Sequence, residues 1–271
     1  MTGNRSPVLI PFCGADLRTR RAALGLHNRD SLHRMLGYRV PTIEVWERNR
    51  SLGPALDMAV VRLARIEKFA DTITASLIAR AETTGVIRTY RTDDEAAEGG
   101  TVIADAALHR VCAGRAAAAC PDARLVIDSL TDSEQSTAEQ KAAFLVRLAM
   151  LGLTWKPLRH ATGINPRIVQ LWLAGDDLTR IFPDQMQRIA DMEAGMDTHR
   201  AVLLTHLDES GFVPVAYSDE DLAVIDPDTV ITTDTHRVIA GDLLADDFDA
   251  RARWVNPPPP REQRPDPSHA A

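Results

Sequence analysis

The chain contains the same series of residues twice. Residues 37–89 align without gaps with residues 163–215, which lie 126 positions later, and eleven of the 53 aligned pairs are identical. A second block, shifted by one further residue, aligns His109–Gly114 with His236–Gly241, where five of six residues are identical. This period is far longer than the roughly 20–50 residues of a solenoid repeat, so each copy is predicted to be a domain.

Two predicted domains therefore fill most of the chain. The first covers residues 1–130 and the second covers residues 131–256. A polar linker without apolar periodicity is predicted over residues 128–137. Residues 257–271 begin with four prolines and contain no apolar run, which predicts an extended, disordered tail.

The composition is that of a globular protein. Apolar residues make up 45% of the 271 residues and charged residues 25%. No uninterrupted apolar stretch reaches the roughly 18 residues of a transmembrane helix, and the apolar run near the N-terminus is too short for a signal peptide. The three cysteines, Cys13, Cys112 and Cys120, show no C-x-x-C spacing. We therefore expect a cytoplasmic protein with reduced thiols, no membrane contact, no metal site and no cofactor.

Charge is distributed unevenly along the chain. The net charge of −7 argues against nucleic acid as a partner, but residues 1–70 hold twelve Arg and Lys against six Asp and Glu. Residues 196–271 hold six against fifteen. The basic N-terminal region keeps nucleic-acid binding open in spite of the average.

The first part of each copy predicts three short helices. In copy one, apolar residues at helical spacing indicate a helix over residues 17–26, and Asn28 suits the N-cap of a second helix. Gly37 ends this second helix, because glycine adopts a left-handed turn most easily. Ile43 and Trp46 are predicted to face inward from the third helix.

Copy two repeats this order. Thr154 suits the N-cap of its second helix, and Gly163 makes the turn that follows. Asn165 suits the N-cap of the third helix, with Pro166 at the first helical position. The inner face of this third helix is predicted to hold Ile168, Leu171 and Trp172.

The second part of each copy predicts one long helix and a small α/β piece. The long helices cover residues 54–85 and 183–210. After each, the sequence predicts a strand, an acidic loop, a helix around His109 or His236, and a final strand. The fold class is therefore mainly α with small α+β appendages. The long helices or the α/β pieces are expected to form an internal interface between the copies.

A helix, a glycine turn and a helix with a buried tryptophan form a helix-turn-helix pattern in both copies. Residues 37–48, Gly-Tyr-Arg-Val-Pro-Thr-Ile-Glu-Val-Trp-Glu-Arg, resemble the λ-repressor-type (XRE) helix-turn-helix, including Trp46 and Glu47 at the end of the recognition helix. Residues 163–172 resemble its turn and recognition helix more closely, although Leu173 replaces the glutamate. Each copy is similar nearly end to end to the anti-CRISPR-associated regulator and YdiL type of this group.

This resemblance implies two tandem λ-repressor-like helix-turn-helix domains, each followed by a long helix and a short strand-helix-strand piece. It implies a phage-associated repressor of transcription that binds double-stranded DNA sequence-specifically and is not an enzyme. Two recognition helices in one chain would read adjacent major grooves. A homodimer is compatible with this function, and a protein partner is not identified.

Base contacts are expected from the start and the outward face of each recognition helix. In copy two these residues are Asn165, Arg167 and Gln170, with Lys156 and Arg159 placed to hold phosphates. In copy one they are Arg39, Thr42 and Glu44, with Arg48 and Arg50 placed to hold phosphates. Because the residue types differ, the two copies would read different half-sites.

Other functions remain open on the sequence alone. One copy could be a degenerate scaffold, or the whole chain could be a non-DNA-binding adaptor or an antitoxin-like interaction protein. The acidic clusters at residues 93–95 and 219–221, together with the two His-Arg pairs, could suggest a metal-dependent nuclease. Clustered acids are usually solvated and no ligand spacing supports a metal, so His109–Arg110 and His236–Arg237 are interpreted as structural.

Overall fold

The structure is a computed structural model that describes residues 12–27, 29–48, 53–101, 103–127, 135–174 and 183–256. These residues form twelve helices and four short strands, so the chain is mainly helical with small α/β parts, as predicted. None of the helices described is long and apolar enough to span a membrane. The predicted tail over residues 257–271 and most of the predicted linker lie outside the described residues.

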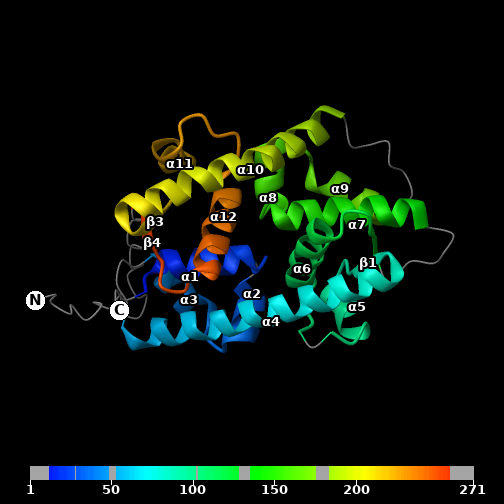
Figure 1. Ribbon diagram of the computed structural model, residues 1–271, viewed down its shortest axis with the longest axis horizontal. Helices are drawn as coiled ribbons and strands as arrows, with labels where there is room; N and C mark the ends of the chain where they lie inside the picture. Colours follow the sequence, from blue (N-terminus) through cyan, green and yellow to red (C-terminus); the bar gives the residue numbers. More distant parts are fainter. Residues whose placement is uncertain are drawn as a thin grey trace, which may run out of the picture.

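The two copies contain the same elements in the same order (Figure 1). The first copy comprises α1 (Gly14–Ala23), α2 (Arg29–Leu36), α3 (Val40–Arg48), α4 (Pro54–Thr84), β1 (Val86–Thr89), α5 (Asp93–Glu98), α6 (Ala106–Ala119) and β2 (Arg124–Ile127). The second comprises α7 (Gln135–Met150), α8 (Trp155–Thr162), α9 (Pro166–Ala174), α10 (Pro183–Ser210), β3 (Phe212–Val215), α11 (Asp219–Ile225), α12 (Thr233–Asp246) and β4 (Arg251–Trp254).

Glycines end the helices at the predicted positions. Gly37 and Gly163, which follow α2 and α8, have φ of 73° and 75°. Gly85 and Gly211, which follow the long helices α4 and α10, have φ of 67° and 74°. These are left-handed conformations that glycine adopts without steric strain. The turns predicted at these four positions are therefore confirmed.

The acidic loops predicted after the first strand of each copy are in fact short helices. α5 and α11 each begin with three acidic residues. Their N-cap residues, Thr92 and Ser218, accept hydrogen bonds from the backbone N–H groups of Glu95 and Asp221. A hydroxyl N-cap and carboxylates in the first turn both stabilise the start of a helix. The loop prediction was wrong because it treated these carboxylates only as solvated charges.

The inner face of α9 also differs from the prediction. Val169 is fully buried, whereas Leu171, which was expected to face inward, is 52% exposed. The repeat explains the difference, because Val169 aligns with Ile43, the fully buried residue of α3. The side chain of Trp172 lies outside the described part of the chain. α7 begins at Gln135, inside the predicted linker.

Each copy ends in a small α/β unit. β1 pairs in parallel with β2, with Val86 opposite Arg124, and β3 pairs in parallel with β4, with Phe212 opposite Arg251. Two parallel strands need a crossover connection, and here it runs through α5 and α6, or through α11 and α12. The predicted strand-helix-strand piece is therefore present in both copies, with the extra short helix.

The first helix of each copy packs on the α/β unit of the other copy. α1 lies against α12 and β4, and α7 lies against α6 and β2. The long helices α4 and α10 carry the chain from one lobe of the molecule to the other (Figure 1). Each lobe therefore combines the three short helices of one copy with the α/β unit of the other. The contact between the copies therefore involves the α/β pieces, which were one of the two expected interfaces. It crosses the boundary between the predicted domains, which lies after residue 130.

A glycine lies where the first helix of each copy crosses a helix of the other copy. A Cβ added at Gly241 of α12 would lie 2.1 Å from the carbonyl oxygen of Thr19 in α1. A Cβ added at the equivalent Gly114 of α6 would lie 2.5 Å from the side chain of Met150 in α7. The repeated His-Arg-Val-x-Ala-Gly block thus ends in a residue that lets two helices come into close contact.

Two ion pairs recur at equivalent positions in the copies. Arg20 of α1 lies 2.9 Å from Glu67 of α4, and Arg147 of α7 lies 2.6 Å from Glu193 of α10. Arg20 is fully buried, and burial raises the pKa of Glu67 while Arg20 opposes that rise. Removing one partner of such a pair would leave a poorly solvated charge. In each copy, this arginine–glutamate pair therefore connects the first helix to the long helix of the same copy.

A repeated arginine closes the turn after α2 and α8. Arg62 donates from Nη1 to the carbonyl oxygen of Leu36 at 2.7 Å, and Arg188 donates to that of Thr162 at 3.4 Å. The last carbonyls of a helix have no partner within the helix, so a cation there stabilises the end. Both arginines belong to the identities that reveal the repeat.

Gly241→Ala should destabilise the protein by roughly 1–3 kcal/mol, because the new methyl group meets main-chain atoms of α1. Gly114→Ala is the matched variant. Its Cβ meets only the side chains of Met150 and Val146, and the better helix propensity of alanine offsets about 1 kcal/mol. Urea unfolding of both variants measures the difference. Equal midpoints for the two would contradict the close contact between α1 and α12.

Candidate nucleic-acid interface

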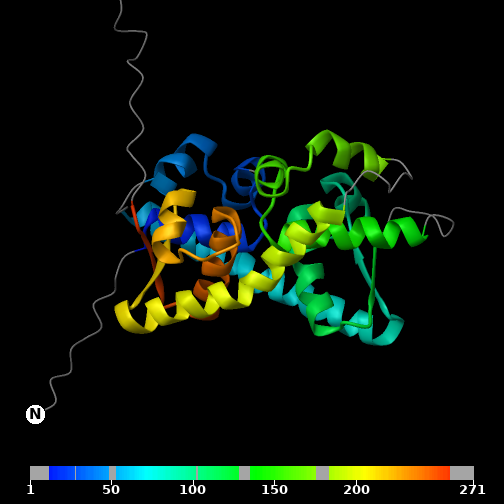
Figure 2. The ribbon, with the colours of Figure 1, turned by 90° about the horizontal axis from the view of Figure 1, so that it is seen from above.

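α3 and α9, the helices expected to carry base contacts, lie on the same side of the molecule, one over each lobe (Figure 2). α2 and α8 lie between them, near the middle of the molecule in both views (Figures 1 and 2). α1 packs on α12 and α7 packs on α6, so the first helix of each copy is fixed to the α/β unit of the other copy. Corresponding surfaces of the two copies therefore face one side.

The predicted contact residues of copy two are all exposed. They are Lys156, Arg159, Asn165, Arg167 and Gln170. Residues 155–174 contain three Lys and Arg and no carboxylate, so this helix pair carries a net positive charge. Asp219 of α11 lies 3.3 Å from His160 of α8. A polyanion would meet favourable charge on this surface.

Asn165 caps α9 as predicted. Its Oδ1 accepts a hydrogen bond from the backbone N–H of Arg167 at 3.0 Å, and Pro166 is the first helical residue. The amide NH₂ of Asn165 is therefore the group most available to a base. Thr154 lies at the N-cap of α8, as expected, but its hydroxyl accepts no hydrogen bond from that helix.

Copy one exposes fewer of its predicted contact residues. Arg39 is exposed at the start of α3, whereas Thr42, Glu44 and Arg48 are partly buried. Arg50 lies outside the described residues. The glutamates of α3 also lower the positive charge of this helix pair relative to α8 and α9. The core role predicted for Trp46 is confirmed, since it is 9% exposed.

Two arginines of the basic N-terminal region are buried, and a third, Arg18, is half-buried. Arg20 pairs with a glutamate of α4, and Arg21 pairs with a glutamate of α3. The Arg18 guanidinium lies 5.0 Å from the ring centre of Tyr217. The charge count over residues 1–70 therefore overstates what this region offers to a polyanion. Of the two helix pairs, α8 with α9 is the more basic surface.

Sequence reasoning missed one pair of surface residues on these helices. Val45 of α3 is 47% exposed and Leu171 of α9 is 52% exposed. The two residues align in the repeat, so the 126-residue shift was the signal that could have identified them. Apolar side chains on the outer face of a groove-binding helix can contact thymine methyl groups.

The repeated His-Arg pairs hold the α/β units together. Arg110 donates from Nη1 to the carbonyl oxygens of Tyr90 and Arg91, just after β1, at 3.2 and 3.0 Å. Arg237 donates to the carbonyls of the two equivalent residues after β3. Burial lowers the pKa of Arg237 to about 10, which still leaves it charged at neutral pH. These contacts support the structural interpretation of the pairs.

In copy two, buried side chains form a chain of hydrogen bonds. His236 Nε2 accepts from the backbone N–H of Ala216 at 3.0 Å, so its Nδ1 carries the proton and donates to Nε2 of His199 at 2.8 Å. Nδ1 of His199 then donates to Asp226 at 2.8 Å. Both rings are neutral in this arrangement, and burial lowers the pKa of each. Copy one has Ile73 in place of His199, so it cannot form the same chain.

The part of the chain that the structure describes holds no group of three or more His, Cys, Asp or Glu side chains able to bind a metal ion. The acidic residues at 93–95 and 219–221 lie in the first turns of α5 and α11. Asp93 accepts from the backbone of Ala106 and pairs with Arg34 of α2 at 2.9 Å. Asp219 accepts from Thr233 and lies 3.3 Å from His160 of α8. The metal-dependent nuclease considered from the sequence therefore has no supporting site among these residues.

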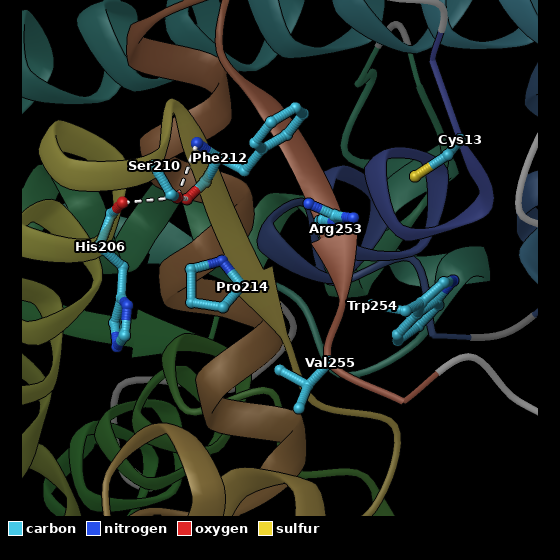
Figure 3. A pocket seen from close by; sticks show the side chains of 8 residues that line it. All are labelled: Cys13, His206, Ser210, Phe212, Pro214, Arg253, Trp254 and Val255. Carbon is cyan, nitrogen blue, oxygen red and sulfur yellow. Dashed lines mark hydrogen bonds between the residues drawn. The ribbon is translucent and has the colours of Figure 1, made fainter.

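A hollow of about 560 Å³ lies beside β3 and β4, and its lining includes Cys13, His206 and Ser210 (Figure 3). Figure 3 shows Cys13 across β4 from the other two side chains. The Cys13 thiol donates to the carbonyl oxygen of Ala252 at 3.2 Å, and burial raises its pKa to about 12. Ser210 donates to the carbonyl of His206 at 2.7 Å. Nucleophilic catalysis needs a nucleophile next to a base, which these side chains do not provide.

No family model, curated protein or solved structure matches this chain. Its function is therefore inferred from its own geometry and charge. Among the surfaces described, the side that carries α3 and α9 combines exposed hydrogen-bonding side chains with positive charge (Figure 2).

Acidification should destabilise the protein between pH 7.0 and about pH 5.5. Burial lowers the pKa of His27 to about 3 and also lowers those of His199 and His236, so the folded protein keeps these rings neutral. In the unfolded chain each titrates near 6.5, so unfolding takes up protons below that pH. The stability that depends on the neutral rings is therefore lost as the pH falls. We expect a loss of about 1 kcal/mol from His27 over this interval, and further losses from His199 and His236.

Urea unfolding at the two pH values measures this loss. His199→Gln should reduce the pH dependence, because it removes one of the rings that the fold keeps neutral. His33→Gln removes an exposed histidine and is the matched control. An unfolding free energy that does not change over this interval would show that the buried rings are not held neutral.

Proposed function

We propose that the protein is a sequence-specific regulator of transcription that binds double-stranded DNA and acts as a repressor by occupying a promoter. The α2–α3 and α8–α9 pairs are helix-turn-helix motifs of the λ-repressor (XRE) type, with α3 and α9 as recognition helices. One observation carries this proposal. Exposed Asn165, Arg167 and Gln170 lie on a helix pair without a carboxylate, on the side of the molecule that also presents α3 (Figure 2).

The side chains at the start of α9 suit direct reading of bases in a major groove. Arg167 can donate two hydrogen bonds to guanine, and Gln170 can bind adenine through both amide atoms. The exposed Leu171 adds an apolar contact for a thymine methyl group. Lys156 and Arg159 of α8 suit phosphates, which position a protein on DNA without reading its sequence.

α3 would read a different sequence from α9. Arg39 aligns with Asn165, and Glu44 aligns with Gln170, so a guanine donor and a cytosine acceptor replace two adenine-type contacts. Thr42 adds a hydroxyl and a methyl group to this surface. The preferred DNA site is therefore asymmetric, with one half-site for each copy.

The exchanged packing supplies two recognition helices within one chain. Dimeric helix-turn-helix repressors place two such helices about 34 Å apart, one helical turn of DNA. Here the contacts of α1 with α12 and of α7 with α6 take the place of a dimer interface. A homodimer is compatible with this arrangement but is not required for contact with two half-sites.

Arg167→Ala should weaken binding to the preferred DNA site by roughly 5- to 150-fold, which corresponds to about 1–3 kcal/mol, and relax the preference at one base pair. Arg80→Ala is the matched control, since it removes an exposed arginine from α4. Gel mobility shift with the preferred duplex and a scrambled duplex measures both variants. The preferred duplex comes from selection of bound fragments of the parent genome.

The salt dependence of the same assay tests the electrostatic part of the proposal. Binding should weaken steeply as salt rises, because each Lys or Arg that neutralises a phosphate releases a counterion. If Arg167→Ala matches Arg80→Ala on both duplexes, α9 is not a reader of sequence. The alternative function, an adaptor or antitoxin-like interaction protein with the same fold, predicts no binding to any duplex at modest salt.

A further inference from the structure

A cavity of about 540 Å³ lies where the two copies meet. Two equivalent turns border it: the turn at Gly25 and His27, between α1 and α2, and the turn at Leu153 and Trp155, between α7 and α8. Helices α6 and α7 supply further lining residues. A volume of this size suits a small organic molecule.

The repeat shows why there is space at this place. Three of the lining residues are Leu145, Leu148 and Leu173. The equivalent positions in copy one hold the longer, charged side chains of Arg18, Arg21 and Glu47. Arg21 and Glu47 form a buried ion pair there, and the Arg18 guanidinium packs over an aromatic ring. Copy two replaces these ionic contacts with leucines, which fill less volume and leave apolar walls.

Two polar side chains of the cavity, Arg110 and His27, have hydrogen-bonding groups to spare. Arg110 uses Nη1 for two backbone carbonyls, and no contact with its remaining N–H groups is present among the described residues. Nε2 of His27 is buried and has no hydrogen-bond partner among the residues that the structure describes. Both residues line the cavity. A buried polar group without a partner is costly, so these groups favour a ligand that pairs with them.

The charge of Arg110 selects among ligands. Burial lowers its pKa, and the neighbouring Asp105, Asp93 and Glu95 oppose that effect, so the guanidinium is a poorly solvated cation. An anionic group that binds a guanidinium directly forms a charge-assisted hydrogen bond, which is stronger than a neutral one. The leucine walls in turn favour an apolar body.

We propose that this cavity binds a small molecule with an apolar body and one anionic group. The body lies against Leu145, Leu148 and Leu173, and the anionic group accepts hydrogen bonds from Arg110. A bound ligand would contact both helix pairs, because the residues that line the cavity include Ser31 of α2 as well as residues of α8 and α9. An effect of such a ligand on DNA binding rests on the proposed function, whereas its binding to the protein does not.

Titration of the free protein with anilinonaphthalene sulfonate tests the proposal. This dye has apolar rings and one sulfonate, and its fluorescence rises in apolar surroundings. We expect one dye per chain, with energy transfer from Trp155, which lines the cavity. Phenylnaphthylamine has the same rings without the sulfonate and should bind at least about tenfold more weakly.

Variants locate the bound dye. Leu148→Arg with Leu173→Glu restores the ion pair of copy one and should reduce dye affinity at least about tenfold. Leu173→Phe fills the cavity with apolar bulk alone and should act in the same direction, which covers the case in which the double variant fails to fold. Leu204→Arg removes an exposed leucine of α10 outside the cavity and should leave dye binding unchanged.

Arg110→Gln tests the anionic contact. It should weaken binding of the sulfonate dye about tenfold and leave the neutral analogue unaffected. The proposal is overturned if Leu173→Phe binds the dye as tightly as the natural protein, or if both dyes bind equally well. Because no DNA is present, a negative result leaves the proposed function untouched, and a failed mobility shift leaves the cavity untouched.

Discussion

The close contact of each first helix with the α/β unit of the other copy fixes how the two copies are arranged. At Gly241 the main chains of α1 and α12 approach so closely that no side chain fits between them. The equivalent contact at Gly114 joins α7 to α6. The two contacts make each lobe from both copies, and they place α3 and α9 on one side of the molecule (Figure 2). A chain with two independent copies would have no fixed relation between these helices.

The copies have kept their scaffold and diverged at their surfaces. Residues that end helices, cap carbonyls or pair across helices are the same in both, as with Glu67 and Glu193. The exposed residues of α3 and α9 differ in charge and hydrogen-bonding type, which fits two different half-sites. The cavity between the copies arises from the same divergence, since leucines stand where copy one has a buried ion pair.

The sequence was most informative where a single residue determines backbone geometry. Gly37, Gly163 and Pro166 predicted the ends and starts of helices correctly, because left-handed turns and first helical positions have few alternatives. The structure of the acidic segments could not be predicted in this way, because carboxylates suit both a solvated loop and the first turn of a helix. Leu171 was misplaced because short apolar helices allow more than one inner face.

The exchange between copies could not be predicted from the repeat. A repeat shows which elements are equivalent but does not show whether α1 packs on the α/β unit of its own copy or on that of the other, since both packings bury the same faces. The basic N-terminal count was misleading for a related reason. Arg20 and Arg21 contribute to the charge of that region, but they pair inside the protein.

The extent of DNA that one chain protects tests whether a single polypeptide presents two recognition helices, as proposed above. Footprinting, combined with the mass of the protein–DNA complex, measures protection and stoichiometry together. We expect one chain to protect two neighbouring major-groove segments about one helical turn apart. Protection of one such segment per chain, with a second chain needed for the other, would contradict it.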